Sequence, residues 1–138
     1  MSHEYQASRK VALGLGCDRG TPEATIAQAV QEALAAAGLA PEQVAAVASI
    51  TLKADEVGLL SFAERFGLSL AFYPPEVLAT VPVPNPSETV RKYTGTPSVS
   101  EAAALLAAGT DMSRLLIEKH KLRGPDGRNA TVSIALLP

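Results

Sequence analysis

The sequence predicts an α/β fold, a three-layer α/β/α domain with a mixed, largely parallel sheet of about five strands and a C-terminal antiparallel hairpin. Three observations lead to this prediction. Short apolar runs typical of buried strands alternate with segments whose apolar residues recur at helical spacing. Hydrophobic residues are 47% of the chain and aromatic residues only 4%, so the core is mainly aliphatic. Two strand-loop-helix units, each followed by another strand, favour right-handed crossovers between parallel strands.

The domain organisation follows from the length of the chain. Its 138 residues are the size of one ordinary domain, and no repeat or low-complexity linker divides them. Residues 1–8 are polar and are expected to be a flexible N-terminus. Residues 9–138 are expected to form a single domain.

The first strand is expected at Lys10–Leu15 (KVALGL), an apolar run that stops at glycines. Thr21, Pro22 and Glu23 then supply an N-cap, a proline at the first helical position and an acid in the first turn. The helix that they begin ends at Gly38.

The second unit begins with a strand at Val44–Leu52 (VAAVASITL). Asp55 is expected to cap the next helix, which Gly67 ends. Leu68–Tyr73 (LSLAFY) gives the third strand.

The following segment, Pro74–Pro86, holds five of the ten prolines and is expected to be a stiff, mostly extended surface loop. Within it, Val81 and Val83 offer apolar surface on a stiffened backbone. After it, Ser87 is expected to cap a helix.

The last part of the chain predicts a helix and a hairpin. Ser98 and Glu101 have the spacing of a capping box, and Gly109 closes the helix that they begin. The strands Arg114–Leu122 and Ala130–Leu137 are separated by a glycine-rich turn, which indicates an antiparallel hairpin at the sheet edge.

Composition excludes several classes of function. The chain has a net charge of −2, so it lacks the surplus of lysine and arginine that is typical of nucleic-acid binding proteins. The single cysteine permits no internal disulfide, and with two histidines it makes no zinc or iron–sulfur site, so no metal is expected. No export signal is evident, and no apolar run approaches the roughly 20 residues that span a bilayer. We expect a cytoplasmic protein with no membrane partner.

The stretch GLGCDRGTPE, Gly14–Glu23, contains three glycines before a helix. It is not a dinucleotide fingerprint, because Arg19 stands where the third glycine is required, and no P-loop is present. Its backbone N–H groups and the positive end of the helix dipole suit an anion. Alternatively, the glycines serve only the tight turn.

Cys17 in this stretch is a weak candidate for a reactive thiolate. Arg19 and the following helix N-terminus lower a thiol pKa, whereas Asp18 opposes the shift. Neither His3 nor His120 is near in sequence to act as a base. A small buried residue at the end of a strand is the favoured interpretation.

Two further groups of residues are candidates for a site. Lys53 and its neighbours Asp55 and Glu56 lie on a strand-to-helix connection, which in a parallel sheet reaches the same carboxyl-end edge as the glycine turn, where ligands of such sheets bind. The two-residue period of a strand places Lys119 and Lys121 on one face and the histidine between them on the other. Alternatively, the acids cap a helix and the lysines only keep an edge strand soluble.

Five segments occur in a fixed order along the chain: GLGCDRGT, ASITLKADEVGLL, PNPSETV, GTPSVSEAAALLAAG, and the closing EKHK with TVSIALLP. Together they resemble the cobalamin-biosynthesis family formed by CobE and the carboxyl-terminal domain of CbiG. The resemblance covers Val11–Pro138 and is to the standalone, CobE-like form.

The resemblance implies a protein of the aerobic corrin pathway that binds a precorrin or corrin intermediate through its carboxylates. Other corrin-pathway enzymes are expected partners, and no cofactor is expected. The substrate-binding candidates are Gly16, Cys17, Arg19, Gly20, Lys53, Asn85, Ser87, Lys119 and Lys121.

The alternative is a hydrolase, because CbiG opens the lactone of a cobalt-precorrin and releases acetaldehyde. Opening such an ester needs a base and an oxyanion donor. The candidates for these roles are Asp18, Lys53, Asp55 and Glu56.

Overall fold

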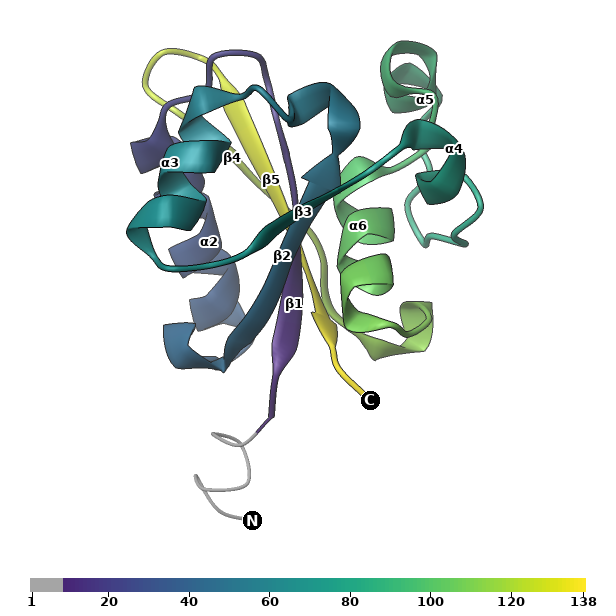
Figure 1. The fold of residues 1–138 in the computed structure, drawn as a ribbon, viewed down its shortest axis with the longest axis horizontal. Helices are drawn as coiled ribbons and strands as arrows, with labels where there is room; N and C mark the ends of the chain where they lie inside the picture. The colour runs from purple at the N-terminus through teal and green to yellow at the C-terminus, as the bar shows by residue number, and fades with distance from the viewer. Residues whose placement is uncertain (1–8) are drawn as a thin grey trace.

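The middle layer of the molecule is a five-stranded sheet with the order β3-β2-β1-β5-β4 (Figure 1). The computed structural model describes residues 9–138, so the expected flexible N-terminus, residues 1–8, lies outside the described residues. The strands are β1 Val11–Cys17, β2 Val44–Ile50, β3 Leu70–Tyr73, β4 Leu115–Arg123 and β5 Asn129–Leu136.

The sheet is mixed, as predicted. Strand β1 pairs in parallel with β2, and β2 pairs in parallel with β3. Strand β5 is antiparallel to both of its neighbours, β1 and β4. The predicted hairpin is therefore confirmed, with β4 at the edge of the sheet and β5 inside it.

Helices cover both faces, which confirms the three-layer architecture (Figure 1). One face carries α2 (Glu23–Ala36) and α3 (Val57–Arg65), and the other carries the remaining helices. These are α4 Pro75–Leu78, α5 Glu88–Thr94 and α6 Val99–Ala108. Successive side chains of β1 point to opposite faces of the sheet, so each face has its own hydrophobic core. Val11, Leu13 and Leu15 pack with α2 on one face, and Ala12 packs with α6 on the other.

Helix α6 lies unusually close to β1, and Gly14 permits this approach. A Cβ atom at Gly14 would meet the carbonyl oxygen of Ser100 at 1.8 Å and the backbone nitrogen of Ala104 at 2.5 Å. The glycine therefore sets how closely the amino-terminal half of α6 approaches the middle of β1.

Two of the predicted helix caps are wrong, and a third, Ser98, stands at the predicted position without its capping box. Helix α2 begins after Pro22, and the Thr21 hydroxyl instead donates to the carbonyl oxygen of Asp18 at 2.8 Å. Helix α3 begins after Glu56 rather than Asp55. The capping box of α6 does not form, because the Glu101 carboxylate accepts from Asn85. Asp55 and Glu101 bond to partners distant in sequence, and the Thr21 hydroxyl bonds to a carbonyl three residues earlier, so in each case another partner competes successfully for the polar side chain.

The predicted cap at Ser87 is confirmed, since its hydroxyl accepts from the backbone N–H of Val90 at 3.2 Å. The proline-rich loop differs from the prediction at its start, where α4 makes one turn and buries Leu78 completely. The second strand is also shorter than predicted, because the 3-10 turn η2 (Thr51–Lys53) follows Ile50 directly.

Candidate functional site

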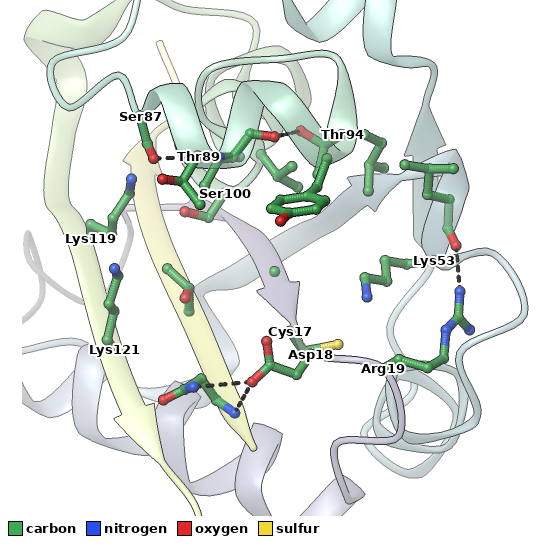
Figure 2. Close-up of a pocket in the computed structure, with 18 residues that line it drawn as sticks. Cys17, Asp18, Arg19, Lys53, Ser87, Thr89, Thr94, Ser100, Lys119 and Lys121 are labelled. Carbon is green, nitrogen blue, oxygen red and sulfur yellow. Dashed lines mark hydrogen bonds between the residues drawn. The ribbon is translucent and has the colours of Figure 1, made fainter. Parts of the chain in front are cut away.

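A cleft of about 820 Å³ lies at the carboxyl end of the parallel strands, below helix α5 (Figure 2). Strands β1 and β4 are both antiparallel to β5, so the carboxyl ends of β1, β2 and β4 meet at this edge. The first two residues of α6, Val99 and Ser100, also line the cleft. The cleft therefore occupies the position where open α/β sheets bind their ligands.

Most of the residues selected from the sequence line this cleft. Among the substrate-binding and catalytic candidates, those that line it are Gly16, Cys17, Asp18, Arg19, Lys53, Ser87, Lys119 and Lys121. Gly20, Asp55 and Glu56 line a smaller pocket beside it, which Arg19 also touches. Asn85 lines neither.

Three lysines provide positive charge on opposite sides of the cleft. Figure 2 shows Lys119 and Lys121 on one side and Lys53 on the other. Within residues 9–138, Lys53 and Lys121 form no hydrogen bond or ion pair, and the Lys119 ammonium donates only to the carbonyl oxygen of Asn85, at 3.2 Å. The ammonium groups of Lys53 and Lys121 are therefore available within these residues to bind an added anion.

A bulge in β4 brings Glu118 and Lys119 to the α6 face together. Ile117 pairs with Ile134 of β5, and His120 pairs with Val132, so β4 carries one extra residue between these pairs. Such bulges redirect side chains and are common beside functional sites. His120 points to the opposite face, where its Nε2 lies 2.8 Å from the Glu32 carboxylate on α2.

Arg19 is engaged by the protein's own acids. Its guanidinium lies 2.9 Å from the Asp55 carboxylate and 3.0 Å from that of Glu56, and it also donates to the carbonyl oxygen of Leu52. The hydrogen bond and charge of Arg19 hold the pKa of the Asp55 carboxyl below its usual range. Arg19 therefore joins the end of β1 to the η2–α3 connection, and its charge is already compensated.

The turn after β1 also binds a carboxylate of the protein itself, that of Glu56. Glu56 is only 3% exposed, and its carboxylate accepts from the backbone N–H of Gly20 at 2.9 Å. The backbone N–H of Asp18 donates to the carbonyl oxygen of Asn129. Two of the N–H groups expected to receive a ligand anion are thus already bonded within the protein.

Asp18 and Cys17, at the end of β1, have different environments. One carboxylate oxygen of Asp18 accepts from the backbone and side-chain N–H groups of Asn129, at 2.8 and 3.0 Å. Burial raises the pKa of the Cys17 thiol to about 11, against the lowering effect of Lys53. The thiol is therefore protonated at neutral pH, which disfavours a nucleophilic role.

The apolar part of the cleft was missed by sequence reasoning. Five apolar side chains line it, namely Ile50, Leu52, Val90, Tyr93 and Val99. Tyr93 is 74% exposed although it borders the cleft. The valines of the proline-rich loop, Val81 and Val83, pack against the core beside α6 instead. Two of the five, Val90 and Tyr93, lie on the helix that Ser87 caps, and the predicted cap was the sequence feature that could have located them.

Residues 9–138 contain no group of three or more His, Cys, Asp or Glu side chains placed to hold a metal ion. No helix in this part of the chain is long and apolar enough to cross a bilayer.

The model of the family described as "Cobalamin synthesis G C-terminus" matches residues 11–135. The chain belongs to this family. It is a cobalamin-biosynthesis protein, as the sequence resemblance predicts.

Two curated relatives carry more specific descriptions. The chain is 39% identical over 128 residues to a cobalt-precorrin-5A hydrolase of Priestia megaterium, covering 93% of this chain and 32% of that protein. It is 39% identical over 116 residues to Protein CobE of a Sinorhizobium species, covering 83% and 75% respectively. The chain thus spans about a third of the hydrolase and three quarters of the CobE relative.

Solved structures share the fold. The crystal structure of CobE, a protein from the cobalamin biosynthetic pathway, matches with a TM-score of 0.79 and 27% identity, over 94% of this chain and 95% of that one. The cobalamin biosynthesis protein chiG of Agrobacterium tumefaciens matches with a TM-score of 0.62 and 32% identity, over 92% and 97%. The α/β fold is therefore that of the family.

Proposed function

We propose that the cleft binds a precorrin or corrin intermediate of cobalamin biosynthesis through the carboxylates at the edge of its macrocycle. The observation that carries this proposal is the arrangement of Lys53, Lys119 and Lys121 on opposite sides of an apolar surface. Such an intermediate is a flat apolar ring fringed by acetates and propionates. The names of the CobE relative and structure support this class of ligand.

The expected binding free energies indicate that both the lysines and the apolar side chains of the cleft are needed for tight binding. Each exposed charge pair contributes about 0.2–1 kcal/mol, so three lysines supply about 3 kcal/mol at most. Micromolar binding corresponds to about 8 kcal/mol. The remainder has to come from the macrocycle face against Ile50, Leu52, Val90, Tyr93 and Val99, since apolar burial contributes about 25 cal/mol per Å².

The experiment is an absorption titration with cobyrinic acid, a corrin whose side-chain carboxylates are free, and with a corrin in which they are amidated. We expect saturable binding of the acid at low salt and much weaker binding of the amide. Replacing Lys53 and Lys121 together by alanine should lower the affinity for the acid and reduce its salt dependence. The control is Lys10→Ala, because Lys10 lies before the amino end of β1, at the opposite edge of the sheet. Equal affinities for acid and amide, or no binding of either, would overturn the proposal.

A second candidate function is lactone hydrolysis, favoured by the identity of 39% to a cobalt-precorrin-5A hydrolase. In the cleft, Asp18 is the carboxylate available as a base and Lys53 a donor for the developing oxyanion. Asp55 and Glu56 are paired with Arg19 outside it. Release of acetaldehyde from a lactone-bearing precorrin, lost in Asp18→Asn, would support this function; a lactone that persists at high protein concentration would refute it.

A further inference from the structure

A polar cluster beside the cleft joins three elements of the fold. We call it the Asn85 cluster, and it consists of Asn85, Glu101, Glu118 and Lys119. The Asn85 side-chain amide donates to Glu101 at 2.6 Å and to Glu118 at 3.0 Å. The backbone carbonyl oxygen of Asn85 accepts from the Lys119 ammonium at 3.2 Å. The loop before α5 is thereby tied to helix α6 and to strand β4.

Glu101 is the buried end of this cluster. Its side chain is 0% exposed and has no ion pair within residues 9–138. A buried carboxylate is costly unless it is hydrogen-bonded. The Asn85 side chain bonds one of its oxygens, and the Asn85 backbone N–H bonds the other at 3.3 Å. Its position in the first turn of α6 adds the favourable helix dipole. Asn85 is therefore what makes the burial of Glu101 tolerable.

Helix α5 depends on such flanking contacts for its position. None of its residues is buried, although Val90, Tyr93 and Thr94 line the cleft. It is entered through the Asn85 segment and left through Gly95, which has a φ of 82°. A hydrogen bond of 2.8 Å from the Ser87 N–H to the Pro97 carbonyl closes the loop. Contacts at the ends of the helix, rather than a packed face, hold it over the cleft.

We propose that Asn85 is a positioning residue for the ligand cleft. It binds no ligand itself. Its side chain holds the loop whose backbone carbonyl accepts from the Lys119 ammonium, and it thereby positions both that ammonium and α5 beside the cleft. This inference rests on the proposed function, since the ligand that Lys119 receives is the tetrapyrrole carboxylate. It changes the role expected for Asn85 from ligand contact to support of the ligand contacts.

The first test uses the protein without ligand and compares Asn85→Asp with Asn85→Ala by hydrogen exchange. Asp has nearly the shape of Asn, but it places a third carboxylate against Glu101 and Glu118. We expect amide exchange across residues 86–96 to rise at least about tenfold in the Ala variant and further in the Asp variant, with α2 unchanged. If the cluster served only to fill space, Asp would be tolerated better than Ala, and that order would overturn the proposal. Glu88→Gln is the control within the same segment, because it removes only the surface pair with Arg91.

A second variant isolates the electrostatic cause. Glu118→Gln placed in the Asn85→Asp protein removes one of the opposing carboxylates. We expect it to restore part of the exchange protection of residues 86–96. No restoration would contradict the assignment of the Asp effect to charge repulsion.

The last test measures cobyrinic acid affinity in a cycle of Asn85→Ala, Lys119→Ala and the double variant. We expect Asn85→Ala alone to weaken binding about three- to tenfold, and to weaken it less when Lys119 is already absent. Binding by the Asn85→Ala protein equal to wild type would refute the positioning role and leave the proposed function intact. No binding by the wild-type protein would refute the proposed function and the part of Asn85 in it, while the exchange result would still decide whether Asn85 holds α5.

Discussion

Replacing Gly14 by alanine tests whether the close approach of α6 to β1 determines stability. The added Cβ would lie 1.8 Å from the Ser100 carbonyl oxygen, whereas ordinary contacts begin near 3.4 Å, so α6 has to move outward by about 1.6 Å. Both atoms that it meets first are backbone atoms, so no side-chain rotation relieves the clash. Overpacking of this kind costs about 1–3 kcal/mol, and we expect the upper end of that range.

The assay is thermal unfolding followed by circular dichroism. For a chain of this size, 1 kcal/mol corresponds to about 4 °C in Tm, so Gly14→Ala should lower Tm by about 8–12 °C. Gly16→Ala is the matched control in the same strand, because its Cβ would meet only Thr131, at 3.9 Å. Alanine there also restricts the unfolded chain, so we expect a Tm equal to wild type or up to about 4 °C higher.

A Tm of Gly14→Ala within about 2 °C of wild type would refute this reasoning. It would mean that α6 can move away from the sheet without loss of packing. Because Val99 and Ser100 line the cleft, the same displacement should also weaken ligand binding by the folded variant.

Three further predictions concern the edge of the sheet. The rate of Cys17 alkylation should increase with pH up to about 11, and a rate that levels off near pH 9 would contradict the raised pKa. Because the pKa of the thiol is higher in the folded than in the unfolded protein, the stability that the protonated thiol contributes is complete below pH 9 and is lost as the pH rises toward 11. Arg19→Ala should raise the pKa of Asp55, measured by NMR titration of its carboxyl carbon, and an unchanged pKa would show that Arg19 does not lower it. Glu56→Ala leaves the Gly20 N–H without its acceptor and should cost about 1–3 kcal/mol in urea denaturation, whereas Glu64→Ala, on the exposed side of α3, should cost almost nothing.

The fold was predictable because its pattern of elements is local. Apolar runs and glycine stops located the five strands, and two successive crossovers implied the parallel half of the sheet. The helix caps were not predictable, because a cap is a competition between local and distant acceptors. Asp55 has the right residue type for a cap, but Arg19, 36 positions away in sequence, is a better partner for its carboxylate.

The cleft was predictable only in part. Strand topology brings Cys17, Lys53 and Lys121 to one edge, and the sequence order of strands and helices contains that information. That order does not reveal which charged side chains form ion pairs with one another. Arg19 and Lys53 look equivalent in the sequence, yet Arg19 is compensated by two acids and Lys53 has no partner within residues 9–138. The apolar contribution of Tyr93 depends on where α5 lies, which no periodicity specifies.

The position of β5 between β1 and the edge strand β4 affects how the protein folds during synthesis. Its first residues pair with the end of β1, so Ala130 meets Cys17 across more than a hundred residues of chain. Closing so long a loop is entropically costly and slows folding. During synthesis, β1 lacks one of its two neighbours until the last described strand has left the ribosome. Until then the buried edge of β1 is open to other chains, and dependence on chaperones in the cell is the expected consequence.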